Sequence, residues 1–472
     1  MFYCYEGDKL ITGQSLPEII TQLPQAPAFN HQYLQDYLTQ GLFFRQANNN
    51  STVFKNIYRI PFGYELSATG TLQRAWNIYD KGEIEEPKNL LLQFQEKLTD
   101  AVTKCLVQAN KVGLELSGGL DSSSVAALIR QALPEVELIA FTNGLPKNSI
   151  LEKKMLYDES AYSRQVAQHL RLQQIIINSD YDFHTLVERY TELLGSFSEV
   201  IFPFLNYRCY ELAQQAGIDT LFSGFGGDEM VSQQAGRYLH ELKASRKYIH
   251  YYYEKLRSKN TKDWLRILKI LKNTASRLVM PVTHQDFLKI MIEQPEVPEL
   301  ATVQEYEFAL IQGALSTHLD RRVSTLKSLS AHYGITYQFP LLDPELLQFF
   351  HRLPSSFKRK HGKGRYALRQ VMQHLLPKNI VWRSDKEGGT VPAAQDAFVR
   401  ALPKLFLERV SPGYQGVLKD YIEIPKLIKR IEKEIIHDAG LLRLSLMVMM
   451  FVHLESWLPK QKYKNAVSKF SY

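Results

Sequence analysis

Residues 114–124, LELSGGLDSSS, form a short segment in which glycines, hydroxyls and a carboxylate stand side by side. An apolar run over 112–116 precedes the glycines and apolar residues at helical spacing follow over 125–129, so we expect a strand, a turn and a helix. Backbone N–H groups in such a turn and at the helix start bind an anion. Gly118 and Gly119 let the backbone approach a phosphate closely. Three serines add hydroxyl donors to this predicted phosphate site: Ser117, Ser122 and Ser123.

Asp121 is the unexpected residue of this turn, because a carboxylate repels a neighbouring phosphate. A Mg²⁺ ion between the two groups removes that repulsion. A second glycine-rich turn, SGFGGDE over 223–229, carries Asp228. Taken alone it also fits a flexible acidic loop, but turns that follow parallel strands share one edge of the sheet. We therefore expect Asp121 and Asp228 to bind one Mg²⁺ ion.

The elements around these turns alternate between apolar strand-like runs and helical patterns. This alternation predicts an α/β fold with a parallel, Rossmann-like sheet and helices on both faces. Helical patterns dominate from about residue 238 to residue 457, which predicts a large helical C-terminal part. The predicted strands are 112–116, 136–141, 172–177 and 220–222, and the predicted helices between them include 160–170 and 183–193.

Two domains are expected, with a boundary near residue 86. Residues 1–86 carry short strand-like runs at 2–5, 52–54 and 64–66, separated by Gly, Asn and Pro turns, which predicts a small β-rich module. Residues 82–87 resemble a linker, and a helix is expected over 89–108. The second domain therefore covers 87–472.

Composition is that of a globular protein, with 45% hydrophobic and 22% charged residues among 472. Three cysteines without a Cys-x-x-Cys pair argue against a disulfide framework and a zinc site, and favour a cytoplasmic location. The N-terminus lacks the pattern of a signal peptide, and the apolar run 444–452 is too short to span a bilayer, so no membrane contact is expected.

The net charge is +8, and basic residues concentrate over 243–272 alongside Tyr251, Tyr252, Tyr253 and Trp264. Such a stretch either binds nucleic acid or forms the solvated face of amphipathic helices. We favour the solvated face, so nucleic acid is not an expected partner.

The glycine turns resemble those of a known family. Ser-Gly-Gly alone fits an ordinary strand-to-helix turn, but the string SGGLDSS resembles the pyrophosphate loop of the ATP pyrophosphatases, and no Walker A lysine follows the glycines. Together with the second turn, it resembles the synthetase half of the asparagine synthetase family. Further similar segments are FPLLD over 339–343, RYALR over 365–369 and LP…R…K over 376–386, so the resemblance covers about 89–460.

The resemblance implies an ATP-dependent ligase that releases AMP and pyrophosphate while it joins a carboxylate to an amine. Asp121 and Asp228 would bind Mg²⁺. Lys386 would act on the pyrophosphate and the reacting acyl group, with help from Arg365, which stands where Lys is common. The general base is not identified, and Asp158 and Glu159 are the candidates. Pyrophosphate would bind Ser117, Gly118, Gly119, Ser122 and Ser123, and backbone groups near Glu115, Thr142, Ser223 and Gly224 would bind adenine and ribose.

The first departure from the family concerns the N-terminal module. It is about half the size of the family's glutaminase domain, Phe2 stands where that domain has its catalytic cysteine, and Cys4 lies two residues further on. No glutamine pocket is recognisable. We therefore expect the amine to come from a source other than glutamine, and we expect the 1–86 module to dock a partner protein or a peptide, because half a sandwich leaves an open edge or face.

The second departure is Phe225, because asparagine synthetases place Glu at this point of the loop and β-lactam synthetases place Tyr. An aromatic residue here, and the strings over 158–170 and 223–232, resemble the lasso-peptide macrolactam synthetases, or isopeptide-forming cyclases. The favoured prediction is therefore macrolactam formation on a precursor peptide, with a peptide-recognition protein or leader peptidase as partner. Free asparagine synthesis is the alternative. A tRNA-modifying ATP pyrophosphatase and a non-catalytic partner protein are less favoured.

Overall fold

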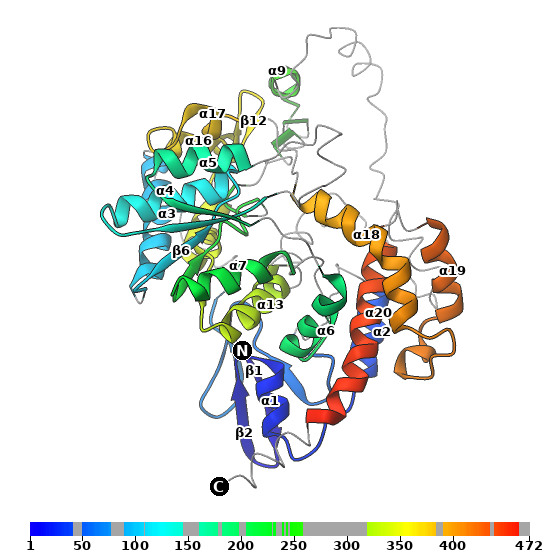
Figure 1. Cartoon of the computed structure of the whole chain (residues 1–472). Coiled ribbons are helices and arrows are strands. Elements are labelled where there is room, and N and C mark those ends of the chain that lie inside the picture. Colours follow the sequence, from blue (N-terminus) through cyan, green and yellow to red (C-terminus); the bar gives the residue numbers. More distant parts are fainter. Residues whose placement is uncertain are drawn as a thin grey trace.

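A parallel sheet with helices on both faces forms the centre of the molecule, a small module lies at its N-terminal end, and long helices lie beside it (Figure 1). The structure is a computed structural model. It describes residues 1–40, 50–76, 89–107, 109–144, 160–177, 182–197, 204–228, 230–232, 238–239, 242–243, 246–257, 319–383, 390–434 and 439–461. The expected linker at 82–87 lies outside these residues.

The central sheet has five parallel strands in the order β10-β9-β6-β7-β8. Its strands are β6 (Val112–Glu115), β7 (Ile139–Asn143), β8 (Gln173–Ile177), β9 (Thr220–Phe222) and β10 (Thr336–Gln338). The expected parallel sheet is confirmed. Two details were wrong: β7 begins at Ile139 rather than at 136, and β9 is followed by a further parallel strand, β10, which forms the edge of the sheet.

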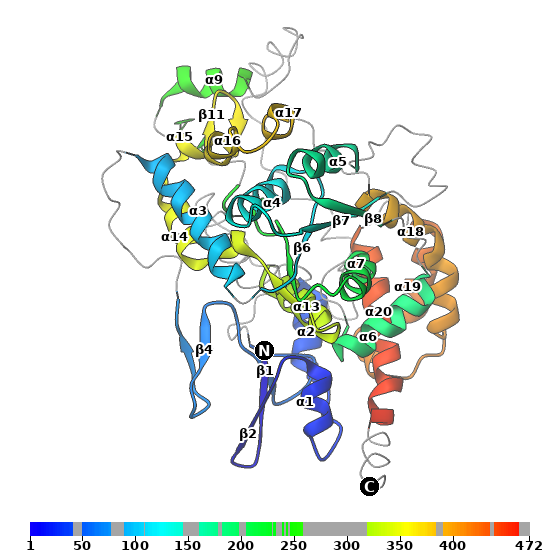
Figure 2. The same cartoon turned by 60° about the vertical axis from the view of Figure 1, so that its left-hand side comes forward.

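Two groups of helices cover the sheet, as Figures 1 and 2 show from two directions. Helix α5 packs on β7 and β8, with α4 and α3 on the same side, while α7 and α13 pack on the opposite face. Helices α5, α7 and α13 contact the strands directly, whereas α3 packs on α4. Their bounds are α3 (Leu90–Leu106), α4 (Leu120–Ala132), α5 (Ser160–His169), α6 (Phe183–Leu194), α7 (Phe204–Gln215) and α13 (Leu319–His332).

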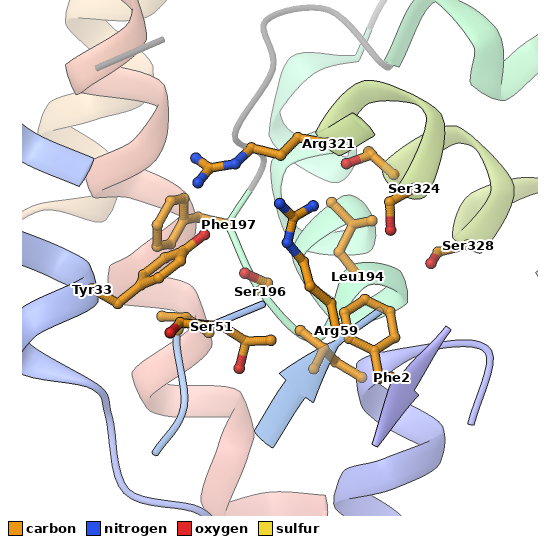
Figure 3. A pocket seen from close by; sticks show the side chains of 14 residues that line it. Phe2, Tyr33, Ser51, Arg59, Leu194, Ser196, Phe197, Arg321, Ser324 and Ser328 are labelled. Atoms are coloured by element: carbon orange, nitrogen blue, oxygen red, sulfur yellow. The ribbon is translucent and has the colours of Figure 1, made fainter. Parts of the chain in front are cut away.

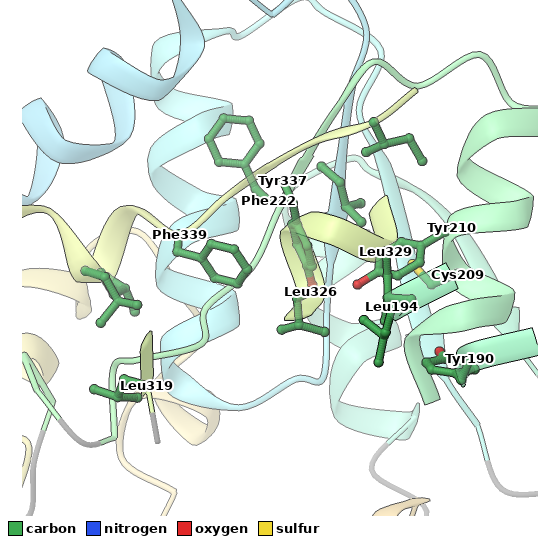
Figure 4. Close-up of a cluster of buried hydrophobic side chains, with 14 of the residues drawn as sticks. Tyr190, Leu194, Cys209, Tyr210, Phe222, Leu319, Leu326, Leu329, Tyr337 and Phe339 are labelled. Atoms are coloured by element: carbon green, nitrogen blue, oxygen red, sulfur yellow. The ribbon is translucent and has the colours of Figure 1, made fainter. Parts of the chain in front are cut away.

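One hydrophobic core runs from the N-terminal module to the last helix. Figure 4 shows the part of this core that lies between the β9–β10 edge of the sheet and helices α6, α7 and α13. Tyr210, Phe222 and Tyr337 are fully or almost fully buried there, and the Tyr210 and Tyr337 rings meet edge to face at 5.7 Å. This packing fixes the carboxyl ends of β9 and β10 relative to each other.

The N-terminal module is mixed rather than purely β-rich. Strand β1 (Phe2–Glu6) pairs with β2 (Lys9–Gly13) and β3 (Ile57–Arg59), and β4 (Tyr64–Leu66) pairs with β5 (Leu72–Arg74). The expected strand over 52–54 is reduced to isolated bridges. Helices α1 (Leu16–Gln22) and α2 (His31–Gln40) were not predicted. Phe2 and Cys4 of β1 and the apolar side chains of α1 are buried in the common core, whereas Tyr5 of β1 is exposed.

Helices dominate the C-terminal part, as expected. Helix α20 passes beside α6 and α18 (Figure 1). The apolar run 444–452 alone was expected to be too short to span a bilayer, but the whole helix is long enough. Inside the protein, 72% of its apolar window is buried, which is typical of a core helix. The remaining elements are η4 (Pro340–Leu342), α14 (Pro344–Arg352), α18 (Thr390–Arg409), η5 (Val417–Asp420), α19 (Ile424–Glu434), α20 (Ala439–Trp457) and η7 (Leu458–Lys460).

A small peripheral group of elements lies above the sheet in both views, around the labels α9, α16 and α17. A hairpin of two short strands belongs to this group and leads directly into α16. The group comprises α9 (Tyr248–Arg257), α15 (Ser355–Lys358), β11 (Arg359–Lys360), β12 (Lys363–Gly364), α16 (Tyr366–Met372) and α17 (Lys378–Val381).

Candidate active site

The first glycine turn connects β6 to α4 at the carboxyl edge of the sheet, as predicted. Ser117 and Ser122 hold the turn closed, because their hydroxyl oxygens lie 3.0 Å apart and the Ser117 amide donates to the Ser122 hydroxyl at 3.2 Å. Gly119 is the N-cap of α4, so the helix begins directly after the glycines and its first-turn amides can bind an anion there. Gly118 has φ of +74°, and a Cβ atom there would lie 2.5 Å from the Ser163 amide nitrogen, so only glycine fits.

The second glycine turn follows β9 and lies directly against the first. A Cβ atom on Gly224 would lie 2.4 Å from the Ser122 amide nitrogen, and one on Gly227 would lie 2.7 Å from the Asp121 carboxyl carbon. Backbone packed this closely leaves no room for side chains at these positions. The structure therefore brings the two predicted turns, which are about a hundred residues apart, into one site.

Asp121 and Asp228 meet at a single guanidinium group. Arg365 donates through Nη1 to Asp121 Oδ2 at 3.1 Å and through Nη2 to Asp228 Oδ1. The side chains of Asp121 and Arg365 are 11% and 8% exposed, whereas that of Asp228 is 40% exposed. One positive group therefore lies between the two carboxylates that the sequence predicts as metal ligands.

This arrangement fits a Mg²⁺ site, because a cation already occupies the space between two hard oxygen ligands. Within the described residues, no group of three or more His, Cys, Asp or Glu side chains is placed to hold a metal by itself. Mg²⁺ is commonly held by one or two carboxylates, with water and substrate phosphate as the other ligands. Asp121 and Asp228 satisfy that requirement beside a phosphate-binding turn.

Arg365 is held in place by its neighbours in the chain. Its φ of +58° is in the left-handed region, which is strained for residues other than glycine. Gly364, the residue before Arg365, is held by Arg369, whose Nε donates to the Gly364 carbonyl at 3.0 Å. Arg369 also donates to the Val381 carbonyl. Burial and the Arg365 charge lower the pKa of Arg369 to about 10, with Asp121 opposing the shift.

Glu115, the last residue of β6, accepts hydrogen bonds from three side chains. Asn206 donates to Oε1, and Ser223 and Tyr337 donate to Oε2, with a distance of 3.1 Å for Ser223. Burial raises the pKa of Glu115, and the hydrogen bonds from Tyr337, Ser223 and Asn206 oppose that rise. Sequence reasoning missed Asn206 and Tyr337, although a glutamate at the end of an apolar strand signals that buried donors lie nearby.

We expect Glu115→Gln to destabilise the protein by about 1–3 kcal/mol, although Gln has nearly the same shape. A carboxylate accepts all three hydrogen bonds, whereas the Gln amide nitrogen faces at least one donor and leaves it unsatisfied. Chemical denaturation followed by circular dichroism measures this change. Glu432→Gln, at an exposed position of α19, is the matched control and should have no effect. Equal stability of both variants would contradict the assigned acceptor role.

The family is shown by a sequence match over most of the chain. The Asparagine synthase family model matches residues 93–458, which include both glycine turns and the Arg365 segment. The chain belongs to the asparagine synthase family.

Two relatives within the asparagine synthase family illustrate the match. A Methanocaldococcus jannaschii protein assigned as a glutamine-hydrolyzing asparagine synthetase is 25% identical over 332 residues, which are 66% of this chain and 61% of that protein. A glutamine-hydrolyzing asparagine synthetase of Bacillus subtilis is 26% identical over 251 residues, which are 48% of this chain and 32% of that protein. The chain thus aligns with less than two thirds of the length of these relatives.

Among solved structures, an ammonia-dependent NAD synthetase from Campylobacter jejuni is similar to this member of the asparagine synthase family. The sequence identity is 15%, and the match covers 45% of this chain and 99% of the other chain. The TM-score is 0.21. A likeness this weak adds nothing to the family assignment.

Phe225, the residue that departs from asparagine synthetases, lies between an arginine and a second aromatic ring. The Arg322 guanidinium lies 4.1 Å from the centre of the Phe225 ring, and the Phe339 ring meets it edge to face at 6.2 Å. Arg322 was not predicted, and no local sequence signal distinguishes it from other helix arginines. Neither neighbour can accept a proton, so this point of the asparagine synthase loop carries no base.

The side chains of two predicted site residues, Thr142 and Ser223, form hydrogen bonds within the protein. The Thr142 hydroxyl donates to the Leu116 carbonyl at 2.6 Å and accepts from Gln174, so the side chain is used within the sheet. Ser123 is fully buried, and its hydroxyl has no hydrogen-bond partner in the described part of the chain. Ser223 donates to Glu115. Lys386, Asp158 and Glu159 lie outside the described residues.

A separate small cavity lies between the N-terminal module and helices α6 and α13 (Figure 3). Its volume is about 50 Å³, enough for a few water molecules. Arg59, Arg321, Ser324 and Ser328 line it, and Arg59 forms a buried ion pair with Asp320 at 2.8 Å. None of its lining residues belongs to the two glycine turns, so it is distinct from the candidate active site.

Proposed function

We propose that this chain is an ATP-dependent ligase that adenylates a carboxylate and transfers the acyl group to an amine. One observation carries the proposal: two glycine turns from separate strands bring Asp121 and Asp228 to one cation, beside the first amides of α4. Membership of the asparagine synthase family supports it. An anion site next to paired carboxylates is suited to a metal-bound polyphosphate.

In the first step, a carboxylate oxygen of the substrate attacks the α-phosphorus of ATP, and the bond from that phosphorus to pyrophosphate breaks. Ser117, Ser122 and the N-terminal amides of α4 bind the phosphates and orient ATP. A bound Mg²⁺, held by Asp121 and Asp228, would neutralise charge on the pyrophosphate. Arg365, released from the two aspartates, donates to the departing pyrophosphate, whose charge grows as the bond breaks.

In the second step, the amine nitrogen attacks the acyl carbon, the bond to AMP breaks, and the amine loses one proton. Phe225 cannot accept that proton, and neither can the Arg322 and Phe339 side chains that contact its ring. An amine tethered to the acyl group needs less help from the enzyme, because positioning alone supplies a large part of the rate. The Phe225 loop also resembles that of macrolactam synthetases, which supports a peptide substrate whose own α-amine attacks its Asp or Glu side chain.

The partners and the location belong to the same proposal. A peptide substrate requires recognition, so we propose that a peptide-recognition protein or leader peptidase works with this chain. A reducing, cytoplasmic location fits its three free cysteines, two of which are buried.

The substrate is tested by offering the purified chain two sets of reactants with MgATP. One set is synthetic peptides that have a free α-amine and one Asp or Glu; the other is aspartate with ammonium or with glutamine. We expect mass spectrometry to show peptide products that have lost one water, together with AMP, and no asparagine. Asparagine formed at a higher rate than any cyclised peptide would return this chain to asparagine synthesis.

A further inference from the structure

Glu254 is a buried carboxylate on a helix whose other side chains are largely exposed. It is 5% exposed, whereas its neighbours on α9, Tyr253 and Leu256, are 41% and 40% exposed. The catalytic proposal gives Glu254 no task. A buried charge is retained only when strong partners compensate its loss of water.

The partners of Glu254 are the turn amides of the β11–β12 hairpin. Oε1 accepts from the His361 amide at 2.8 Å, and Oε2 accepts from the Gly362 amide at 2.7 Å. Both residues have positive φ, +54° and +75°, which is typical of a tight two-residue hairpin turn. Arg359 Nε lies 3.8 Å from Oε2 and balances the charge. Glu254 therefore joins α9 to the tip of this hairpin.

The hairpin leads without a spacer to the residue between the two aspartates. Strand β12 ends at Gly364, and Arg365 follows with its left-handed φ and its bonds to Asp121 and Asp228. Only Lys363 and Gly364 stand between the clamped Gly362 and Arg365, so movement of the hairpin moves the guanidinium. The Tyr253 hydroxyl adds a second, exposed contact to the His361 ring at 3.2 Å.

We infer that Glu254 is a positioning residue for the nucleotide site: it clamps the hairpin tip to α9 and thereby sets where the Arg365 guanidinium lies. Removing the clamp leaves Arg365 in the chain but loosens its geometry. The inference rests on the proposed function, because it takes Arg365 to be a group of the MgATP site. A residue that supports a ligand from behind commonly changes affinity by about 10- to 100-fold when it is lost.

The test is a double-mutant cycle on MgATP affinity, measured by calorimetry without acyl substrate. We expect Glu254→Ala and Arg365→Ala each to weaken binding by about 10-fold, and the double variant to bind no worse than Arg365→Ala. Glu254→Gln keeps one acceptor and should fall between wild type and Glu254→Ala. Glu96→Ala, at an exposed position of α3, is the control and should bind as wild type does.

Hydrogen exchange provides the second readout. The His361 and Gly362 amides should exchange at least about 10-fold faster in Glu254→Ala, because their acceptor is gone. If the double variant lost as much affinity as the two single variants together, Glu254 would not act through Arg365. Normal affinity in Glu254→Ala, with weakened binding in Arg365→Ala, would overturn the inference alone. Normal affinity in Arg365→Ala would overturn the assignment of Arg365 to the nucleotide site, and the inference with it.

Discussion

Replacing Asp121 or Asp228 by Asn lowers the rate of pyrophosphate release by about 100-fold or more, if the two carboxylates hold the cation that offsets charge on ATP. Asn keeps the size of the side chain but removes the charge. Either substitution also leaves the Arg365 guanidinium with one charged partner instead of two, and Asp121 is the more buried of the two. The rate is measured at saturating ATP with a coupled pyrophosphate assay.

Asp100→Asn is the control for both variants, because Asp100 is an exposed residue of α3. It should turn over at the wild-type rate. Turnover of Asp121→Asn or Asp228→Asn within about two-fold of wild type would show that the paired aspartates are not part of the reaction centre.

Gly224→Ala should be nearly as damaging, for a steric rather than an electrostatic reason. The new methyl group would lie 2.4 Å from the Ser122 amide nitrogen and 2.7 Å from the Asp121 carbonyl carbon. Both atoms are backbone, so the two turns must separate. We expect at least about 10-fold weaker MgATP binding together with a stability loss of about 1–3 kcal/mol, the range for overpacking.

Gly413→Ala is the matched control, because the nearest atom to its new methyl group would be Ser411 Oγ at 3.7 Å, an ordinary contact distance. It should bind MgATP normally. If Gly224→Ala also binds MgATP with wild-type affinity, the close contact of the two turns does not matter for the nucleotide site.

The strand, turn and helix around the first glycine turn were predictable because each has a strong local signal. The apolar run of β6, the glycines and the helical spacing after them all agree with one structure. Turns that follow parallel strands lie at one edge of the sheet, so the approach of Asp121 to Asp228 could also be predicted.

Strand β10 and helix α1 were missed for different reasons. β10 has three residues, too few for an alternating pattern, and it is defined by its parallel pairing with β9. α1 did have a signal: Ser15 accepts from the Glu18 amide as its N-cap, and the Ser-x-x-Glu spacing is the pattern of a capping box.

The bridge made by Arg365 was beyond sequence reasoning. Arg365 lies 244 residues from Asp121 and 137 residues from Asp228, and no local pattern records such contacts. Its clamp by Glu254 is equally remote, since Glu254 is 107 residues from His361. Local signals identify what a turn does chemically, whereas the counter-charge that completes the turn comes from packing of distant segments.

The central claim is that the two glycine turns serve the cleavage of ATP between its α- and β-phosphates. The direct measurement follows ATP labelled at the α-phosphorus during turnover with Mg²⁺ and the acyl and amine substrates. We predict label in AMP, with one pyrophosphate released for each amide bond formed. Label in ADP, with inorganic phosphate as the other product, would contradict the account.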